Sequence, residues 1–242
     1  VVGDSSASLV DCTFAGNTAS RDGGGLYASG NGSNVTMTGG VVQNNHGSTN
    51  GGGITAYAGT LILRASVLHG NYAAYGGAVF ATKFADVTIE DCTIEANGQH
   101  RSDPNVRTIW GGGVWLDTAL DRSQSIARSI IRNNKAAQNG GGIDVIAEGS
   151  SPVGVPVTIE SCVIAGNVSG SYGGGISARY GSALQLRLLN CTVAGNEASN
   201  GGGLWSMASQ VTVDNSIFWG NTASTRGPQI STASDTTLRF SD

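Results

Sequence analysis

Three charged residues stand at related positions of a sequence repeat, and their types suit the cleavage of a polysaccharide. Asp117, Asp144 and Arg179 fall two or four residues after successive glycine triplets. Two carboxylates can act as general acid and general base on a glycosidic bond. With about 4.8 Å between neighbouring coils, we expect Asp117 and Asp144 to lie roughly 8 Å apart, as in an inverting pair. The competing interpretation is that all three are ordinary charges on a solvated surface.

Large aromatic residues recur at the same two positions after the triplets. They are Tyr27, Tyr57, Phe80, Trp115 and Trp205. If these positions face outward, the rings form an exposed strip on which sugar rings would stack well. The sequence therefore predicts a contact surface for a glycan or a protein. The alternative is that a loop, a tail or a second chain covers the strip.

The repeat that positions these residues is marked by glycine and asparagine. Glycine triplets open at Gly23, Gly51, Gly111, Gly140, Gly173 and Gly201, and a Gly-Gly-Ala variant opens at Gly76. An asparagine stands before each triplet and once more near the end: Asn17, Asn45, Asn71, Asn97, Asn134, Asn167, Asn196 and Asn221. Glycine permits positive φ and close backbone approach. Asparagine tolerates the left-handed region and, stacked once per coil, can hydrogen-bond the backbone of the next coil. We interpret both sets as structural turns.

Between these landmarks, apolar and polar residues alternate in short runs, as in residues 87–90, 157–160 and 211–214. Alternation with a period of two is typical of strands with one buried face. Each repeat holds three such runs, which predicts an all-β fold: a right-handed, single-stranded parallel β-helix of about eight coils, with residues 1–242 as one domain. A leucine-rich repeat would need a leucine framework, and a β-sandwich gives no reason for equivalent asparagines.

The four cysteines occupy one equivalent position of the repeat. Cys12, Cys92, Cys162 and Cys191 each follow a corner, where other repeats carry serine or glycine. We expect them to point inward as free thiols. Only Cys162 and Cys191, on successive coils, could approach bonding distance, and their spacing fits no zinc motif. No metal or cofactor is predicted.

Composition narrows the range of partners. The 242 residues carry a formal charge of −4, and only 12% of them are charged. The absence of a Lys/Arg cluster argues against nucleic acid, and no apolar run is long enough to cross a bilayer. The chain starts within a repeat and without the pattern of a signal peptide, so we expect it to be part of a longer protein, with flanking segments as neighbours.

Two motifs carry a resemblance to a known family. The pairing of residues 14–17 (FAGN) with residues 23–26 (GGGL), echoed at residues 218–221 (FWGN), resembles the FxxN and GGA[ILV] repeats of the polymorphic outer membrane proteins. Residues 76–79 (GGAV) are the nearest copy of the second motif. Most copies here have Val, Ile or Leu for Phe and GGG for GGA, so the chain equally resembles the wider class of bacterial β-helix repeats. The resemblance implies a secreted or cell-surface protein, often an adhesin, and carries over no catalytic residue.

Three classes of function therefore stay open. The first is a non-catalytic, adhesin-type surface scaffold that contacts a glycan or a protein through the aromatic strip. The second is a polysaccharide-active enzyme, with residues 98–110 as a wall of its cleft. The third is an ice-binding surface on an outward column that includes Thr36, Thr88, Thr158 and Thr212, although charges interrupt the neighbouring column. His46 and His69 each appear in the sequence without a partner.

Overall fold

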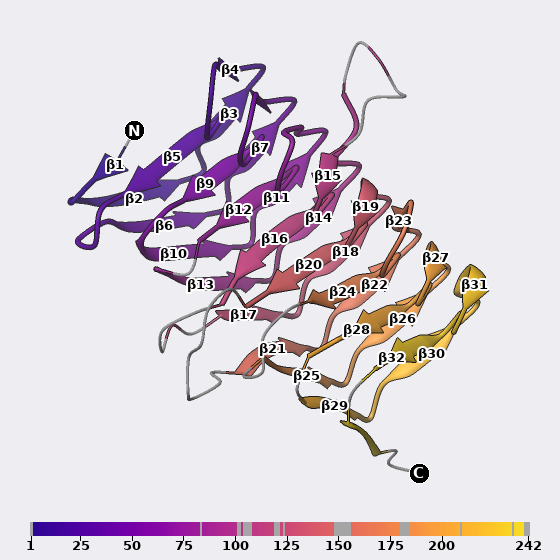
Figure 1. Ribbon diagram of the computed structural model, residues 1–242. Coiled ribbons are helices and arrows are strands. Elements are labelled where there is room, and N and C mark those ends of the chain that lie inside the picture. The colour runs from indigo at the N-terminus through magenta and orange to yellow at the C-terminus, as the bar shows by residue number, and fades with distance from the viewer. Residues whose placement is uncertain are drawn as a thin grey trace.

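The computed structural model describes residues 2–82, 84–100, 103, 108–118, 122, 124–147, 156–179, 184–208, 210–233 and 235–239. Within them the secondary structure is entirely β, and each strand pairs in parallel with the equivalent strand of the next coil. Successive coils stack along one axis from the N-terminus to the C-terminus (Figure 1). This confirms the predicted parallel β-helix with three strands per coil. The described residues include no helix long and apolar enough to cross a membrane.

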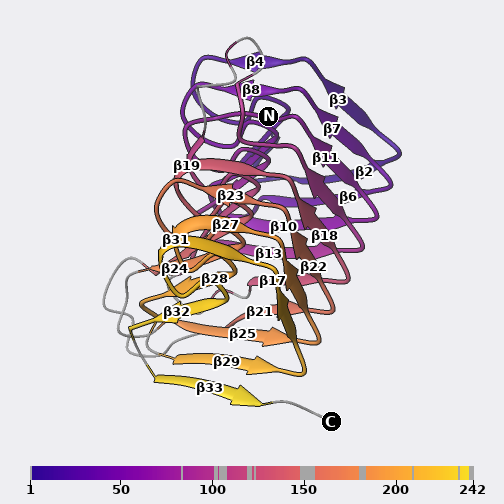
Figure 2. The same ribbon diagram turned by 90° about the vertical axis from the view of Figure 1, so that its right-hand side faces the viewer.

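Three long sheets run the length of the stack, and each coil contributes one strand to each (Figure 2). Sheet 1 contains β1 (Val2–Gly3), β5 (Leu26–Ser29), β9 (Ile54–Ala56), β12 (Val79–Ala81), β16 (Val114–Asp117), β20 (Ile143–Ile146), β24 (Ile176–Arg179), β28 (Leu204–Ser206) and β32 (Ile230–Thr232). Sheet 2 contains β2 (Ser6–Val10), β6 (Asn34–Thr38), β10 (Gly59–Arg64), β13 (Ala85–Glu90), β17 (Gln124–Ala127), β21 (Pro156–Glu160), β25 (Gln185–Leu189), β29 (Gln210–Asp214) and β33 (Asp235–Arg239). Sheet 3 contains β3 (Thr13–Ala15), β7 (Val41–Gln43), β11 (Val67–His69), β14 (Thr93–Glu95), β18 (Ile130–Arg132), β22 (Val163–Ala165), β26 (Thr192–Ala194) and β30 (Ile217–Trp219).

A further short strand lies between sheet 3 and the glycine triplet in several coils, which the sequence did not predict. These strands form a two-stranded sheet of β4 (Thr18–Ala19) and β8 (His46–Gly47), and sheet 4 of β15 (Thr108–Trp110), β19 (Lys135–Asn139), β23 (Val168–Ser169), β27 (Glu197–Asn200) and β31 (Thr222–Arg226). The segments are short and lack a clear alternation of apolar residues. They form strands because each one pairs with the equivalent segment of the neighbouring coil.

The core lies inside the coil, where the inward residues of the three sheets meet. In β13, Val87 and Ile89 are buried, whereas Thr88 and Glu90 point outward. Equivalent residues stack directly on one another, as Leu61 does on Val87. Alternation in the sequence therefore becomes one continuous apolar column per inward position, as a solenoid requires.

The coil bends at three corners, each with a backbone in the left-handed region. The first glycine of each triplet takes positive φ at one corner, for example 64° at Gly23. The second glycine is required by close approach instead, because a Cβ at Gly24 would lie 2.4 Å from the carbonyl oxygen of Gly52. At the corner after sheet 3, the residue with positive φ is the one before the repeated asparagine, as with Gly16 before Asn17. The expectation that the asparagines use the left-handed region themselves is therefore wrong.

The asparagines form a hydrogen-bonded ladder through the protein. The Oδ1 of Asn45 accepts from both the backbone N–H and the Nδ2 of Asn17, at 3.0 and 2.9 Å. The Nδ2 of Asn45 in turn donates to the carbonyl oxygen of Phe14 and to Oδ1 of Asn71. The same pattern continues from coil to coil up to Asn221, whose Nδ2 donates to Gln229. Each buried amide is thereby satisfied, because asparagine supplies both the acceptor and the donor that the ladder uses.

The cysteines point inward as expected and are free thiols. Cys92, Cys162 and Cys191 are buried, whereas Cys12, in the first coils, is partly exposed. Burial is the main cause that raises the pKa of the Cys92 thiol, to about 11. A buried, protonated thiol reacts slowly because the thiolate is the nucleophile.

We expect a thiol reagent at mildly alkaline pH to label Cys12 first and the other three only slowly, since those thiols are buried. Denaturation without reductant should release all four. Intact-protein mass spectrometry over time distinguishes the two populations. Rapid labelling of Cys92 in the folded protein, or only two reactive thiols after denaturation, would contradict this arrangement.

Candidate functional site

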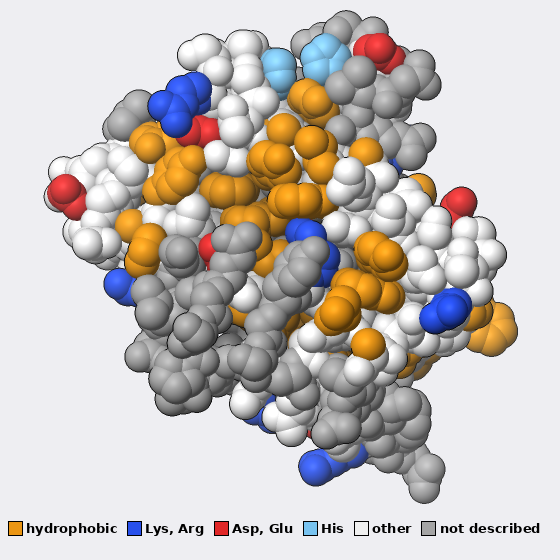
Figure 3. Space-filling model, viewed as in Figure 1, with side chains coloured by type: hydrophobic (Ala, Val, Ile, Leu, Met, Phe, Trp, Pro, Cys, Tyr) orange, Lys and Arg blue, Asp and Glu red, His pale blue; other side chains and the backbone are white. Residues whose placement is uncertain are grey.

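A ladder of aromatic rings runs along the outer face of sheet 1. The ring centroids of Tyr27 and Tyr57 lie 5.7 Å apart, and those of Tyr57 and Phe80 lie 5.9 Å apart. Phe80 and Trp115, which are register partners on β12 and β16, stack at 4.3 Å with an interplanar angle of 2°. The pairing of successive coils thus turns a repeated aromatic position into a stack. Hydrophobic side chains gather over these strands (Figure 3).

The rings are not equally available to a ligand. Phe80 and Trp115 are only 7% exposed, so the expectation that they face water is wrong. They pack with Ile146 into a small second apolar cluster outside the coil, whose partly buried edge includes Tyr57 and Tyr75. Tyr27, Tyr57 and Trp205 remain partly exposed. The accessible part of the predicted strip therefore lies towards its two ends.

A second column, which the sequence analysis missed, runs beside the first. Its members are the residues that immediately precede the first glycine at each corner: Asp22, Asn50, Tyr75, Trp110, Asn139, Tyr172, Asn200 and Arg226. Tyr75 and Trp110 lie 5.0 Å apart, and Tyr172 stacks on Trp205 of the first column at 4.3 Å. The position just before each triplet was the signal that could have identified this column.

At the N-terminal end of this face, three side chains form a closed hydrogen-bonded group. The Nδ2 of Asn50 donates to Oδ1 of Asp22 at 2.9 Å and to the Tyr57 hydroxyl at 2.8 Å. That hydroxyl donates to Oδ2 of Asp22 at 3.2 Å. Burial, followed by the charge of Asp22, raises the pKa of Tyr57, so its hydroxyl keeps its proton at neutral pH. The group holds the Tyr57 ring in place.

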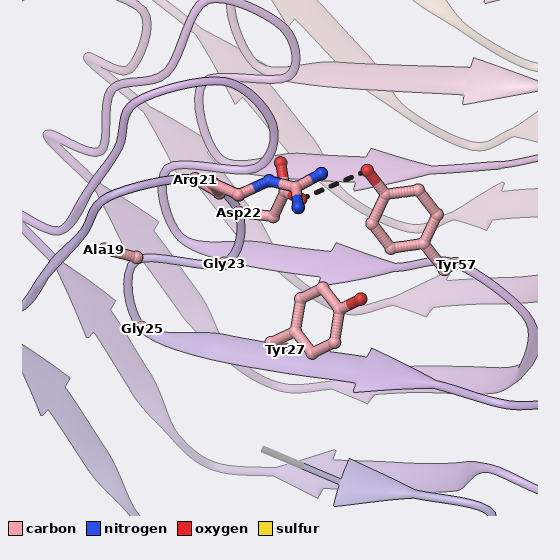
Figure 4. Close-up of a pocket in the computed structure, with 7 residues that line it drawn as sticks. All are labelled: Ala19, Arg21, Asp22, Gly23, Gly25, Tyr27 and Tyr57. Carbon is pink, nitrogen blue, oxygen red and sulfur yellow. Dashed lines mark hydrogen bonds between the residues drawn. The ribbon is translucent and has the colours of Figure 1, made fainter.

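Two members of this group, Asp22 and Tyr57, line a pocket of about 590 Å³. Ala19, Arg21, Asp22, Gly23, Gly25, Tyr27 and Tyr57 line it (Figure 4). Tyr27 lies on β5 and Tyr57 directly follows the neighbouring strand β9, and the Arg21 side chain extends over the pocket towards Tyr57 (Figure 4). Ring faces, a cation, a carboxylate and hydroxyl groups therefore meet in one concave site.

Asp144 and Arg179, two of the three candidate catalytic residues, form an ion pair with each other. Arg179 donates to both carboxylate oxygens of Asp144, at 3.0 and 2.5 Å. The two side chains are 5% and 0% exposed, and the guanidinium carbon lies 4.5 Å from the ring centroid of Trp110. Burial is the main cause that raises the pKa of Asp144, and the Arg179 charge opposes the rise. Asp144 is thus part of a buried ion pair, and no substrate could reach its carboxylate.

Asp117 does not complete an acid pair with Asp144. In the register of β16 and β20, Trp115 lies beside Asp144 and Asp117 beside Ile146. Asp117 is 5% exposed, and its backbone carbonyl accepts a hydrogen bond from Gln124. The expectation that Asp117 and Asp144 form a pair of carboxylates facing an open cleft is therefore wrong.

Comparison with known proteins places the fold in a family. A model described as the right-handed β-helix region matches residues 1–153 and 119–241. The chain belongs to the right-handed β-helix family. No curated protein and no solved structure matches it. Within the part of the β-helix that the structure describes, no group of three or more His, Cys, Asp or Glu residues could hold a metal ion.

The histidines of the β-helix are less isolated than the sequence suggested. His46 lies 5.2 Å from Tyr72 and 5.3 Å from His100, between ring centroids. Burial, and then the charge of His100, lowers the pKa of His46. His69 lies 3.8 Å from a carboxylate oxygen of Glu95. Of the segment expected to wall a cleft, Arg101 and Arg107 lie outside the described residues.

Proposed function

We propose that this β-helix is a non-catalytic binding module of a secreted or cell-surface protein, and that it contacts a glycan through the pocket formed by Tyr27 and Tyr57. The observation that carries the proposal is the combination of two partly exposed rings with a fixed polar group in one concavity. Sugars present C–H faces that pack on aromatic rings and hydroxyl groups that need directed partners. The pocket offers both.

The pocket is also prepared for binding before a ligand arrives. Tyr57 is held by Asn50 and Asp22, so its ring loses little freedom on binding. A site that is rigid beforehand has a smaller entropic cost of association. Arg21 adds a cation at the rim, where it can meet hydroxyl or carboxylate groups of the sugar.

Two further observations support an extracellular binding role. The motifs at residues 14–17, 23–26 and 76–79 resemble repeats of the polymorphic outer membrane proteins, some of which are adhesins. The buried ion pair of Asp144 and Arg179 removes one acid from the pair that an enzyme would require. We therefore favour binding without turnover.

We expect Tyr27→Ala to weaken glycan binding by about 1 to 3 kcal/mol, the loss typical of an aromatic anchor. Tyr57→Phe keeps the ring but removes two hydrogen bonds, and should cost less than Tyr27→Ala. A glycan array identifies the ligand, and titration calorimetry with a soluble oligosaccharide measures each variant.

The matched control is Trp219→Ala, which removes an exposed ring on sheet 3. This ring lies near the C-terminal end of the stack of coils, whereas the pocket lies at the N-terminal end. Its affinity should equal that of the wild type. Equal loss in Trp219→Ala and Tyr27→Ala would show nonspecific adsorption. If the wild type releases reducing ends from a polysaccharide and Asp117→Asn does not, the proposal is wrong and the protein is a polysaccharide-active enzyme.

A further inference from the structure

The outer face of sheet 3 exposes more apolar side chains than any role in folding requires. Of the nine large apolar side chains that the described residues expose, five lie here: Val67, Ile130, Val163, Ile217 and Trp219. Trp219 is 76% exposed and Ile217 is 62% exposed. Contiguous apolar groups of this kind mark interaction surfaces. This face is separate from the pocket on sheet 1.

The first outward column of this face is chemically uniform. Every strand of sheet 3 begins with a β-branched residue: Thr13, Val41, Val67, Thr93, Ile130, Val163, Thr192 and Ile217. These residues are register partners, so they form one straight stripe along the stack. β-branched side chains have few rotamers and lose little entropy on contact. The stripe is rigid and nearly flat.

The second outward column carries charges only at its centre. Its residues, in chain order, are Ala15, Gln43, His69, Glu95, Arg132, Ala165, Ala194 and Trp219. Arg132 and Glu95, on the two central strands β18 and β14, form an ion pair at 2.7 Å. One acid and one base thus stand side by side at the midpoint of the face.

That order is self-complementary. A two-fold axis through the midpoint of β14 and β18 places Glu95 of one copy opposite Arg132 of another, and the reverse. The same operation sets Trp219, the largest residue of the column, against Ala15, one of the smallest. In the β-branched stripe it sets Val67 against Val163. Charge and size therefore match between two copies in antiparallel orientation.

We propose that sheet 3 is the interface of a symmetric dimer of this chain. Seven coil steps of about 4.8 Å make the face roughly 34 Å long. A width of three residues keeps the contact below the roughly 800 Å² per partner of a standard interface. The dimer is therefore weak, with a dissociation constant in the micromolar range.

Sedimentation equilibrium between roughly 1 µM and 1 mM measures this association. Wild type should convert from monomer to dimer with rising concentration. Glu95→Arg and Arg132→Glu should each be monomeric, because each places like charges against each other across the axis. An equimolar mixture of the two variants should associate again, because each then meets the opposite charge.

The matched control is Arg64→Glu, which breaks the same kind of exposed ion pair, with Glu90 on sheet 2, and should dimerise like the wild type. Val163→Lys leaves the central charges intact and should still raise the dissociation constant at least tenfold. Circular dichroism confirms that each variant is folded. A wild type that is monomeric at every concentration, or a variant mixture that does not associate, overturns the proposal.

Discussion

Asn134→Ala is expected to destabilise the β-helix strongly, because Asn134 is a buried member of the asparagine ladder. The Oδ1 of Asn134 accepts two hydrogen bonds from Asn97, and its Nδ2 donates to the carbonyl oxygen of Ile94 and to Oδ1 of Asn167. Alanine removes all four and leaves buried partners unsatisfied. With about 1 to 3 kcal/mol for each unsatisfied group, partly relieved by relaxation, we expect a loss of about 3 to 5 kcal/mol. Urea unfolding measures it.

Two controls separate the ladder from the turn. Asn17 is exposed, and its side chain donates one hydrogen bond, to Asn45, so Asn17→Ala should cost about 1 kcal/mol or less. Asn133, next to Asn134, is exposed with φ of 55°, and Asn133→Gly should change stability by about 0.5 kcal/mol or less. If Asn134→Ala is no worse than Asn17→Ala, the buried ladder does not stabilise the coil.

The fold could be predicted because its landmarks are local in the sequence. Each coil repeats the same three landmarks: glycine before a strand, alternating residues within it and asparagine after it. Each landmark has one physical reason. One expectation was wrong: positive φ was assigned to the ladder asparagines, whereas the residue before each of them has it. Gly16, Asn44 and Ala96 show why, since the residue before each ladder asparagine varies in type and so carries no clear signal.

The candidate site was predicted only in part, because exposure depends on neighbours that the sequence does not place. Phe80 and Trp115 were correctly assigned to the outer face, yet they bury each other by stacking across adjacent coils. The network of Asp22, Asn50 and Tyr57 joins residues up to 35 positions apart. Its members belong to two different columns, and comparison of equivalent positions within one column cannot bring them together.

The same limit applies to the acidic residues. Asp144 and Arg179 were placed on successive coils, which is correct, but both were taken to face solvent. Arg179 follows Ser177, the register partner of Asp144, by two residues, so its long side chain reaches diagonally to the carboxylate. A diagonal contact of this length is within reach of arginine but not of most other side chains.

Breaking the ion pair between Asp144 and Arg179 should also lower the free energy of unfolding by a large amount. Asp144→Ala leaves the Arg179 guanidinium buried without its carboxylate and should cost about 3 to 5 kcal/mol. The double variant Asp144→Leu with Arg179→Met removes both charges and should recover most of that loss. Urea unfolding of Asp144→Leu, Arg179→Met and the double variant gives the coupling between the residues. Single and double losses that simply add would contradict a coupled pair.

Arg179→Met should show a pH dependence that Asp144→Ala lacks. Burial already raises the pKa of Asp144, and Arg179→Met removes the charge that mainly opposes that rise, so the folded carboxyl holds a proton that the unfolded chain releases near pH 3.9. An acid whose folded pKa is raised contributes stability below its unfolded pKa, and this contribution falls as the pH rises through the folded value. The stability lost relative to the wild type should therefore be small at about pH 4 and grow towards neutrality. Unfolding curves over this range check the trend, and a loss that does not change with pH would mean that the carboxylate of Asp144 finds another cationic or hydrogen-bonding partner.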